Sequence, residues 1–376
     1  MAKRPSLNED NKNVLILLPY LKNGDGTAVA LMNYYQALID DNWNVDFLNL
    51  KNTKCQWFEM VKKNGGDVFE LPQVNKYSKK VKSYIKNIVY SKKYNIVHVN
   101  IPGHIGYITL KIAKKAGVRI RIFHAHNPFN CLNIKTIISS KIYDTLIIKQ
   151  ATNLIACSRS AGKSRFKSRK FKIIKNVIDL ERFQYNLESR KEIRQSLNIE
   201  EKIVIGVVGI FARQKNPEFL LKCFYELKKI EPNAFLLWVG DGELKDKMKN
   251  KLISMGLEKD FLFVGRQDNV ENWYSAMDLF LLPSVFEGMG IVFLEAQCTG
   301  LPCLGSRNVP VETEMTGLMH RMSLQKNEKS WAIEMKSLIR KDNDRKTRSQ
   351  EFIEKKYTHD STKEDLKHYY NKLYQR

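Results

Sequence analysis

The sequence lacks the features that mark several large classes of protein. Its six cysteines form no Cys-x-x-Cys pair, which disfavours a zinc or disulfide-exchange centre. The longest apolar stretch, near Val14–Leu21, contains Pro19 and falls far short of the roughly 20 residues of a membrane-spanning helix. The first dozen residues are polar and contain no apolar segment of the kind found in a secretory signal. We therefore expect a cytoplasmic protein.

Two further motifs are missing. No Gly-x-Gly-x-x-Gly follows the first apolar run, which disfavours a dinucleotide-dependent oxidoreductase. No repeat of solenoid length is present. The chain has 376 residues, of which 43% are hydrophobic, and this is enough for two α/β domains of roughly 170–190 residues each.

Acidic residues are scarce in the first half of the chain. Residues 1–180 hold 31 lysines and arginines against 11 acidic residues, whereas the remainder holds 32 against 29. The net charge of +23 therefore belongs almost entirely to the first half, which points to a polyanionic partner such as anionic lipid, a phosphorylated lipid carrier or nucleic acid. A nucleic-acid-binding protein would show interleaved aromatic and basic residues or a known recognition module, and neither is apparent.

Short apolar runs alternate with amphipathic stretches along the whole chain. In the first half, strands are expected at Val14–Leu18, Val45–Leu50, Val68–Leu71, Ile96–Val99, Ile120–His124, Leu154–Cys157 and Ile173–Val177. In the second half they are expected at Ile203–Val208, Phe235–Val239, Phe261–Val264, Leu279–Leu282 and Pro302–Leu304. Strict alternation of strand and helix predicts right-handed βαβ units and a parallel sheet covered on both faces.

The alternation restarts once, so the prediction is an α/β protein of two Rossmann-like, doubly wound domains that face each other across a cleft. The first domain covers residues 1–180 and the second covers 200–358. The charged segment Asp179–Ile199 is the best linker candidate, and a final helix at 360–376 can pack back on the first domain. Ligands of such domains bind at the carboxyl ends of the sheets.

The strongest motif lies late in the chain. Phe286-Glu287-Gly288-Met289-Gly290-Ile291 follows a predicted strand and opens a helix, an arrangement that binds anions through free backbone N–H groups. Glu295 lies one turn into this apolar helix, where a carboxylate is costly unless something hydrogen-bonds it, and the paired hydroxyls of a ribose would do so. Alternatively, Glu287 is an ordinary loop residue and Glu295 is a helix-capped or salt-bridged one.

Here the chain resembles the retaining glycosyltransferases of GT-B fold, family 4, whose hallmark is Glu-x7-Glu. Glu287 and Glu295 have that spacing, and the resemblance implies that Glu287 contacts the sugar and Glu295 the ribose. The resemblance also implies that the donor is bound by Gly24, Gly26 and Thr27 after the first strand, by Arg266 beside the base, and by Gly288, Met289, Gly290 and Ile291. His124-Ala125-His126-Asn127 is similar to a His-Ser-His-Asn segment of capsule and exopolysaccharide enzymes, which makes His126 a catalytic candidate.

The segment Val208–Pro217 departs from the family pattern. The family has arginine directly after Gly209 and lysine five positions later, a pair that holds the donor diphosphate. Lys215 fits, but Ile210 stands at the arginine position. Either Arg213 supplies the missing charge or it is a surface residue. Loss of one donor to the departing phosphate typically costs about 10²–10³ in rate.

The resemblance implies transfer of a hexose or N-acetylhexosamine from a nucleotide sugar to a saccharide or lipid-linked saccharide in surface polysaccharide synthesis. The expected nucleotide is UDP, and the anomeric configuration is expected to be retained. The alternatives are a catalytically silent partner subunit that binds nucleotide sugar, and a nucleic-acid-binding protein. Asp342-Asn343-Asp344 has the form of a metal–diphosphate motif but is expected to be a solvated turn, so no metal is predicted. The basic first half predicts peripheral association with an anionic membrane surface at its cytoplasmic face, and no nucleic-acid partner.

Overall fold

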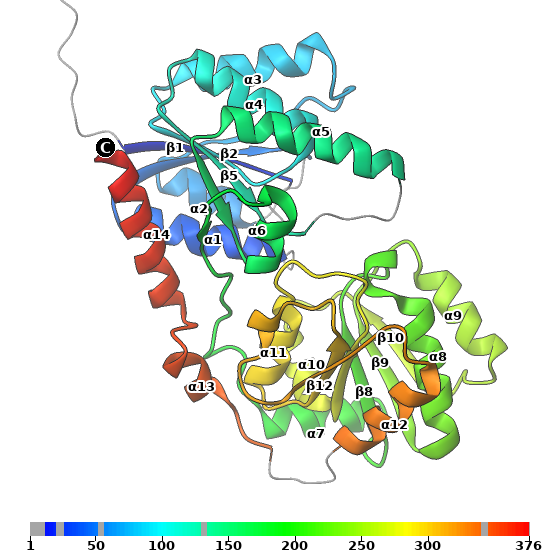
Figure 1. The fold of residues 1–376 in the computed structure, drawn as a ribbon. Helices are drawn as coiled ribbons and strands as arrows, with labels where there is room; N and C mark the ends of the chain where they lie inside the picture. The colour runs from blue at the N-terminus through cyan, green and yellow to red at the C-terminus, as the bar shows by residue number, and fades with distance from the viewer. Residues whose placement is uncertain (1–11, 20–25, 52–55, 129–133, 340–344, 376) are drawn as a thin grey trace, which may run out of the picture. The chain divides into compact units, whose positions relative to one another are not determined.

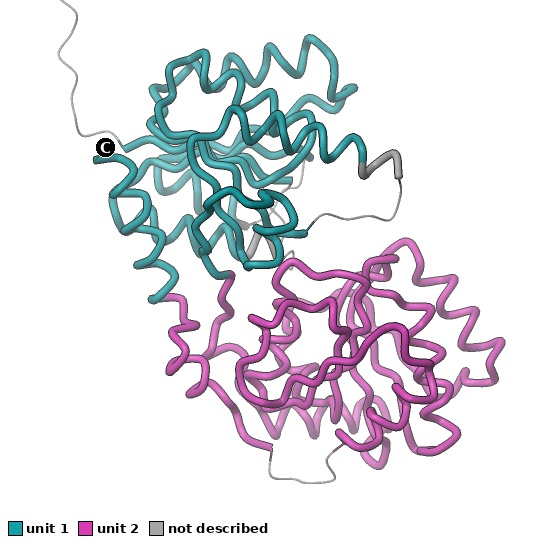
Figure 2. Tube along the Cα trace, in the orientation of Figure 1, with its two compact units in different colours: residues 1–175, 360–376 teal, residues 176–359 magenta. Residues whose placement is uncertain are grey.

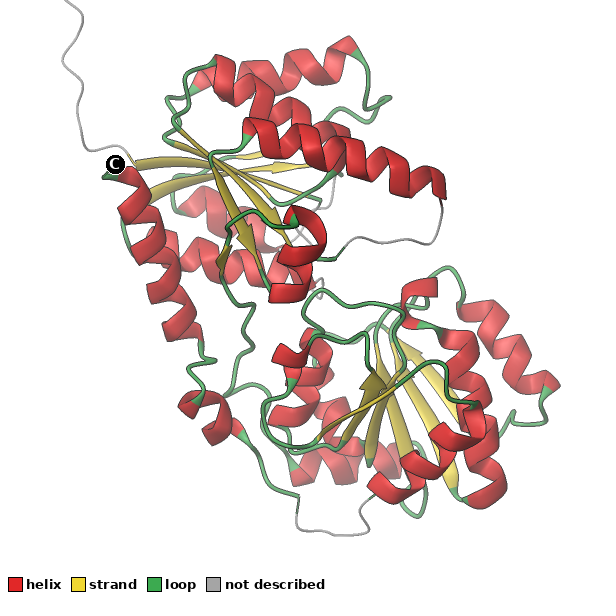
Figure 3. Cartoon of the chain, in the orientation of Figure 1, coloured by secondary structure: helices red, strands yellow, loops and turns green. Residues whose placement is uncertain are grey.

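The computed structural model describes residues 12–19, 26–51, 56–128, 134–339 and 345–375 (Figure 1). The chain divides into two compact units (Figure 2). Unit 1 comprises residues 1–175 and 360–376, and unit 2 comprises residues 176–359. Each unit contains one parallel β-sheet between helices (Figure 3), so the predicted pair of Rossmann-like domains is confirmed.

The described part of unit 1 contains a seven-stranded sheet in the order β3-β2-β1-β4-β5-β6-β7. The strands are β1 (Lys12–Leu18), β2 (Trp43–Asn49), β3 (Val68–Glu70), β4 (Ile96–Val99), β5 (Ile120–Ala125), β6 (Asn153–Ala156) and β7 (Lys172–Ile173), and every pair is parallel. The helices are α1 (Gly26–Ile39), α2 (Gln56–Lys63), α3 (Lys79–Ser91), α4 (Gly103–Lys115), α5 (Ile134–Gln150), α6 (Arg159–Phe166) and α14 (His359–Tyr374).

The core of unit 1 includes the whole apolar stretch of the interior strand β1. Residues 14–18 of β1 are all fully buried, because β1 pairs with β2 on one side and β4 on the other and helices cover both faces. Helix α14 contributes Leu366, Tyr370 and Leu373 to the same core, and the Tyr370 ring meets Trp43 edge-on at 5.5 Å. The last helix of the chain therefore completes the first unit.

The described part of unit 2 contains a six-stranded sheet in the order β10-β9-β8-β11-β12-β13, again parallel throughout. The strands are β8 (Ile203–Val208), β9 (Ala234–Val239), β10 (Phe261–Gly265), β11 (Leu279–Leu282), β12 (Cys303–Ser306) and β13 (Met319–Met322). The helices are α7 (Leu187–Ser196), η1 (Arg213–Lys215), α8 (Pro217–Ile230), α9 (Lys245–Ser254), α10 (Val270–Ala276), α11 (Ile291–Cys298), η2 (Val311–Thr313), α12 (Glu328–Leu338) and α13 (Ser349–Glu354).

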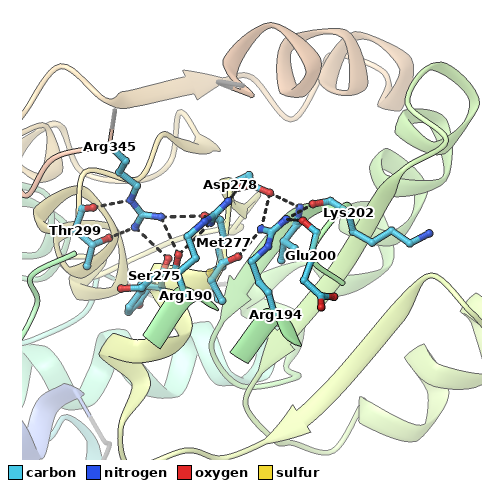
Figure 4. Close-up of polar contacts among 12 residues, drawn as sticks. Arg190, Arg194, Glu200, Lys202, Ser275, Met277, Asp278, Thr299 and Arg345 are labelled. Carbon is cyan, nitrogen blue, oxygen red and sulfur yellow. Dashed lines mark hydrogen bonds and ion pairs between the residues drawn. The ribbon is translucent and has the colours of Figure 1, made fainter. Parts of the chain in front are cut away.

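The segment expected to be a linker contains helix α7, and three arginines attach it and the later chain to the end of α10 (Figure 4). Arg190 and Arg194 each donate to a carboxylate oxygen of Asp278, at 2.6 and 3.1 Å. Arg345 donates to backbone carbonyls of α10 and to Thr299. Cations at a helix C-terminus stabilise its free carbonyls. The charge of this segment thus serves packing within unit 2.

Candidate functional site

The strand order reverses beside the first strand of each sheet, between β8 and β11 in unit 2 and between β1 and β4 in unit 1. In open parallel sheets, ligands bind at such reversals, at the carboxyl ends of the strands. Lys215 lies in η1 after β8, Glu287 lies in the loop after β11, and Glu295 lies on α11, which follows that loop. Unit 2 therefore presents the predicted residues in the segments that follow the two strands at its reversal.

The loop after β11 leads into helix α11. Gly290 caps this helix with a φ of 69°, and a Cβ atom there would lie 3.1 Å from a ring carbon of Phe293. Glycine is therefore the residue that this position accepts without strain. The first N–H groups of an α-helix have no acceptor within it, so the N-terminus of α11 at Ile291 is suited to an anion. Gly288 and Met289 are buried in the loop.

Glu287 is buried in the same loop and forms several hydrogen bonds. Its side chain is 6% exposed, and Lys215 Nζ and Ser284 Oγ lie 2.7 and 2.6 Å from Oε1. Gln214 Nε2 lies 3.5 Å from Oε2. A buried carboxylate is tolerated when it is paired in this way, and removal of one partner typically costs about 3–5 kcal/mol. The structure therefore brings Glu287 and Lys215 together.

The loop after β8 sets the position of Lys215. Gly209 has a φ of 152°, and a Cβ there would lie 3.4 Å from Cε of Lys215, so the lysine stem lies across the glycine. Ile210 points outward and is 54% exposed, and Arg213 is also exposed. The ammonium of Lys215 has three donors, of which one is used by Glu287, so donors remain for an anionic ligand.

Glu295 lies on α11 with a partner that the sequence did not reveal. The hydroxyl of buried Tyr274 donates to Oε2 at 2.7 Å. Burial raises the pKa of Glu295 to about 7, while the hydrogen bond from Tyr274 and the charge of Arg182 oppose that rise. The carboxyl is therefore partly protonated at neutral pH. Any ligand that donates hydrogen bonds to it favours its ionised form.

The loop Gly240–Gly242 and two aromatic side chains also lie beside the site, although the sequence did not single them out. The loop Gly240–Gly242 follows β9 and packs so closely that a Cβ at Gly240 would lie 2.0 Å from the Gly209 carbonyl oxygen. Trp238 Nε1 donates to that same oxygen at 2.9 Å. Phe211 stacks on Trp238 with ring centroids 4.0 Å apart. A Gly-x-Gly directly after a buried strand was the signal for this loop.

In unit 1 the residues at the sheet reversal include three stacked histidines. His126 follows β5, is 8% exposed, and its Nε2 lies 2.8 Å from Asn100 Oδ1. The ring of His124 lies 4.1 Å from that of His126, and His124 Nδ1 lies 3.2 Å from His98 Nε2. Burial lowers the pKa of His98 to about 3 and that of His126 to about 4, so both imidazoles are neutral at physiological pH.

The remaining predicted positions are distributed as follows. Gly26 and Thr27 begin helix α1, and Arg266 follows β10 with an exposed side chain. Gly24 and the segment Asp342-Asn343-Asp344 lie outside the described residues. Within the described ranges no cluster of three or more His, Cys, Asp or Glu residues could hold a metal ion. No helix in the same ranges is long and apolar enough to cross a bilayer.

Comparison with known proteins gives concordant matches. The family model described as "Glycosyl transferases group 1" matches residues 189–356, which lie in unit 2. EpsF of Bacillus subtilis (strain 168), which is named as a glycosyltransferase, is 30% identical over 340 residues, covering 87% of each chain. A UDP-Gal:α-D-GlcNAc-diphosphoundecaprenol α-1,3-galactosyltransferase of Escherichia coli is 30% identical over 258 residues, covering 64% of this chain and 66% of its own.

Solved structures show the same fold. HepE of Anabaena in complex with UDP-glucose superposes with a TM-score of 0.74 at 16% sequence identity, covering 94% of this chain and 98% of HepE. At this identity the likeness shows the fold alone. Both units of the chain are matched, since the aligned region spans almost the whole of it.

Proposed function

This chain belongs to the group 1 glycosyltransferases, and from that premise we propose that it transfers a hexose or N-acetylhexosamine from a UDP-linked donor to a lipid-linked saccharide, with retention of configuration, in exopolysaccharide synthesis. The observation that carries the proposal is the joined pair Lys215–Glu287 beside the N-terminus of α11, with Glu295 one turn further along. This arrangement offers donors for a diphosphate and carboxylates for ribose and sugar hydroxyls.

The proposed roles follow from the chemistry of each group. Unit 2 binds the donor: Glu295 accepts from the ribose hydroxyls, Glu287 accepts from the sugar, and Arg266 flanks the base. Lys215 and the N–H groups at Gly288–Ile291 stabilise charge on the diphosphate as the bond from the anomeric carbon to the phosphate oxygen breaks.

Retention is proposed without an enzyme nucleophile. The electron pair of the broken bond stays on the departing phosphate oxygen, which takes the proton of the acceptor hydroxyl as that hydroxyl attacks the same face of the sugar. In this proposal unit 1 binds the acceptor, and His126 is its catalytic candidate. No step requires a metal.

The acceptor class is supported by charge and by a relative. The Escherichia coli relative is named for a diphosphoundecaprenol acceptor. Four exposed lysines of α3, which we call the α3 lysines, face away from the helix's buried stripe of Val81, Ile85, Ile88 and Val89. They are Lys79, Lys80, Lys82 and Lys86. Lys92 is paired with Asp46 and Asp67 and is not counted with them. Each α3 lysine near an anionic membrane contributes about 1 kcal/mol to the free energy of binding. We therefore propose that the protein binds peripherally at the cytoplasmic leaflet.

A second candidate is a silent subunit that binds nucleotide sugar without transferring it. The exposed Ile210, at the position where the family has arginine, favours it. Single-turnover transfer from a labelled donor separates the two, because only an active transferase moves label to an acceptor.

The first experiment is a panel of nucleotide sugars scored by thermal unfolding. A donor at 100 times its dissociation constant is expected to stabilise the protein by about 2.7 kcal/mol. UDP-sugars should stabilise it more than the corresponding GDP- or ADP-sugars. A panel in which no nucleotide sugar raises the unfolding temperature would contradict the proposal.

A further inference from the structure

Beyond the residues already assigned, we propose that Asn100 is a positioning residue that fixes His126 in the tautomer with its hydrogen on Nε2. The Nδ1 lone pair of His126 is thereby left to accept a ligand hydroxyl. The identity of that hydroxyl, on a sugar, rests on the proposed function. The tautomer itself rests only on contacts within unit 1.

The orientation of the Asn100 amide follows from its two neighbours. The Leu17 carbonyl oxygen lies 3.2 Å from Nδ2 of Asn100, and a carbonyl can only accept a hydrogen bond. The amide nitrogen must therefore face Leu17. The other end, Oδ1, faces His126 Nε2 at 2.8 Å. Because Oδ1 can only accept, Nε2 must carry the hydrogen.

The other ring nitrogen of His126, Nδ1, then has a lone pair, and no described residue is its partner. Within the described residues Nδ1 is buried and makes no hydrogen bond. The pKa of His126, lowered to about 4 by burial, keeps this nitrogen unprotonated at neutral pH. Buried polar atoms are nearly always hydrogen-bonded, since an unmade bond costs about 1–3 kcal/mol. A buried acceptor without a partner therefore points to a ligand that donates.

A cavity beside the ring provides room for that ligand. It measures about 140 Å³ and lies at the carboxyl ends of β1, β4 and β5, lined by His126, Asn100, Pro19, Ile101 and Asn127 among others. Several water-sized groups fit such a volume. The cavity, the orphaned nitrogen and the fixed amide lie at the reversal of the first sheet.

The neighbouring histidines differ from His126 in that their contacts do not fix a tautomer. His98 Nδ1 lies 2.6 Å from the hydroxyl of Tyr370, which can donate or accept, and His98 Nε2 lies 3.2 Å from His124 Nδ1. Either direction of hydrogen bonding is possible along that chain, so it fixes no tautomer, and the far nitrogen of His124, Nε2, is buried without a hydrogen-bond partner among the described residues. Of the three histidines, His126 alone has, among the described residues, a partner whose own contacts fix it as an acceptor: the Asn100 amide, through Oδ1.

The test is a long-range ¹H–¹⁵N correlation spectrum of the full-length ¹⁵N-labelled protein at pH 7, with the His126 signals assigned by their loss in His126→Gln. The expected spectrum shows His126 protonated on Nε2 and not on Nδ1. Asn100→Leu removes the acceptor and should produce the Nδ1-protonated form. Asn100→Asp keeps an acceptor, and Leu17 keeps the Asn100 backbone N–H at 2.9 Å, so the Nε2–H tautomer should persist while the pKa of His126 rises.

A matched control is Asn95→Asp, the same change at the opposite end of β4, where the side chain accepts from the backbone of Asn13. It should leave the His126 signals in place. An Nδ1-protonated His126 in the parent protein, or an Asn100→Leu spectrum identical to the parent's, would overturn the inference. Turnover is scored separately. If the tautomer shifts as expected while the parent transfers no sugar, the proposed function fails and the role of Asn100 in fixing the tautomer stands.

Discussion

Replacing Glu295 by glutamine should raise the free energy of unfolding at neutral and higher pH and leave it nearly unchanged in acid. Burial raises the pKa of this carboxyl from 4.5 to about 7. The folded protein therefore holds Glu295 protonated at pH values where the unfolded chain is ionised. The stability contributed by the protonated carboxyl is complete below pH 4.5 and is lost as the pH rises through 7. Glutamine keeps an acceptor for the Tyr274 hydroxyl and cannot ionise.

The magnitude follows from the difference between the two pKa values. One pKa unit corresponds to about 1.36 kcal/mol, so a difference of about 2.5 sets an upper bound near 3.4 kcal/mol in the free energy of unfolding. Because the side chain is partly exposed, solvent screening should bring the measured effect to about 1–2 kcal/mol.

Urea unfolding of parent and variant at pH 5, 6, 7 and 8 provides the assay. The advantage of the variant should grow with pH and level off above pH 7. The reasoning fails if the difference between the two proteins is constant across this range or shrinks as the pH rises. Glu271→Gln is a suitable control, because that carboxylate is paired with Arg182 at 2.8 Å, whereas Glu295 accepts a hydrogen bond from Tyr274.

Four further outcomes are expected. UDP binding should tighten as the pH rises through 7 and should release a proton in calorimetry, because ribose hydroxyls favour the ionised form of Glu295. Glu295→Gln should abolish this proton release and weaken the affinity for UDP. Glu287→Gln should leave UDP affinity nearly intact while impairing use of the sugar donor; an equal loss of UDP affinity from both changes would refute this division of roles. If Arg213 replaces the arginine missing at position 210, Arg213→Ala should lower turnover by a factor of about 10²–10³, approaching the effect of Lys215→Ala. Full activity of Arg213→Ala would show that Arg213 is a surface residue, and Ile210→Arg would then be the next variant to test. Changing the α3 lysines to glutamate should weaken binding to anionic vesicles at low salt without altering donor affinity, and undiminished binding of the parent at high salt would rule out an electrostatic attachment.

Much of the fold could be predicted because short apolar strands that alternate with amphipathic helices form a parallel sheet. Strand β13 was missed because Met-His-Arg-Met is a half-buried edge strand without a continuous apolar run. The segment that contains α7 is polar and strongly charged, and this composition alone predicts a linker. The partners of its arginines, Asp278 and the carbonyls that end α10, lie more than 80 residues away in the chain.

The candidate site was predictable only in part, for a related reason. Glu287 and Glu295 are visible as a spacing within one segment. Their partners come from other elements: Lys215 and Gln214 from η1, and Tyr274 from α10. No local pattern couples these positions, because only the packing of one parallel strand beside another brings their following loops together. The contact of Asn100 with His126, across β4 and β5, arises in the same way.

The central claim is that unit 2 presents Lys215 and Glu287 to a nucleotide sugar whose sugar is then transferred. Its most direct test is single-turnover transfer from a radiolabelled UDP-sugar that stabilises the protein, with a lipid extract rich in diphosphate-linked saccharides as acceptor. We expect label to move into the lipid fraction with its anomeric configuration retained, and to remain on the donor when Lys215→Ala is used instead. A parent protein that binds the donor yet leaves all label on it at every acceptor concentration would contradict the account.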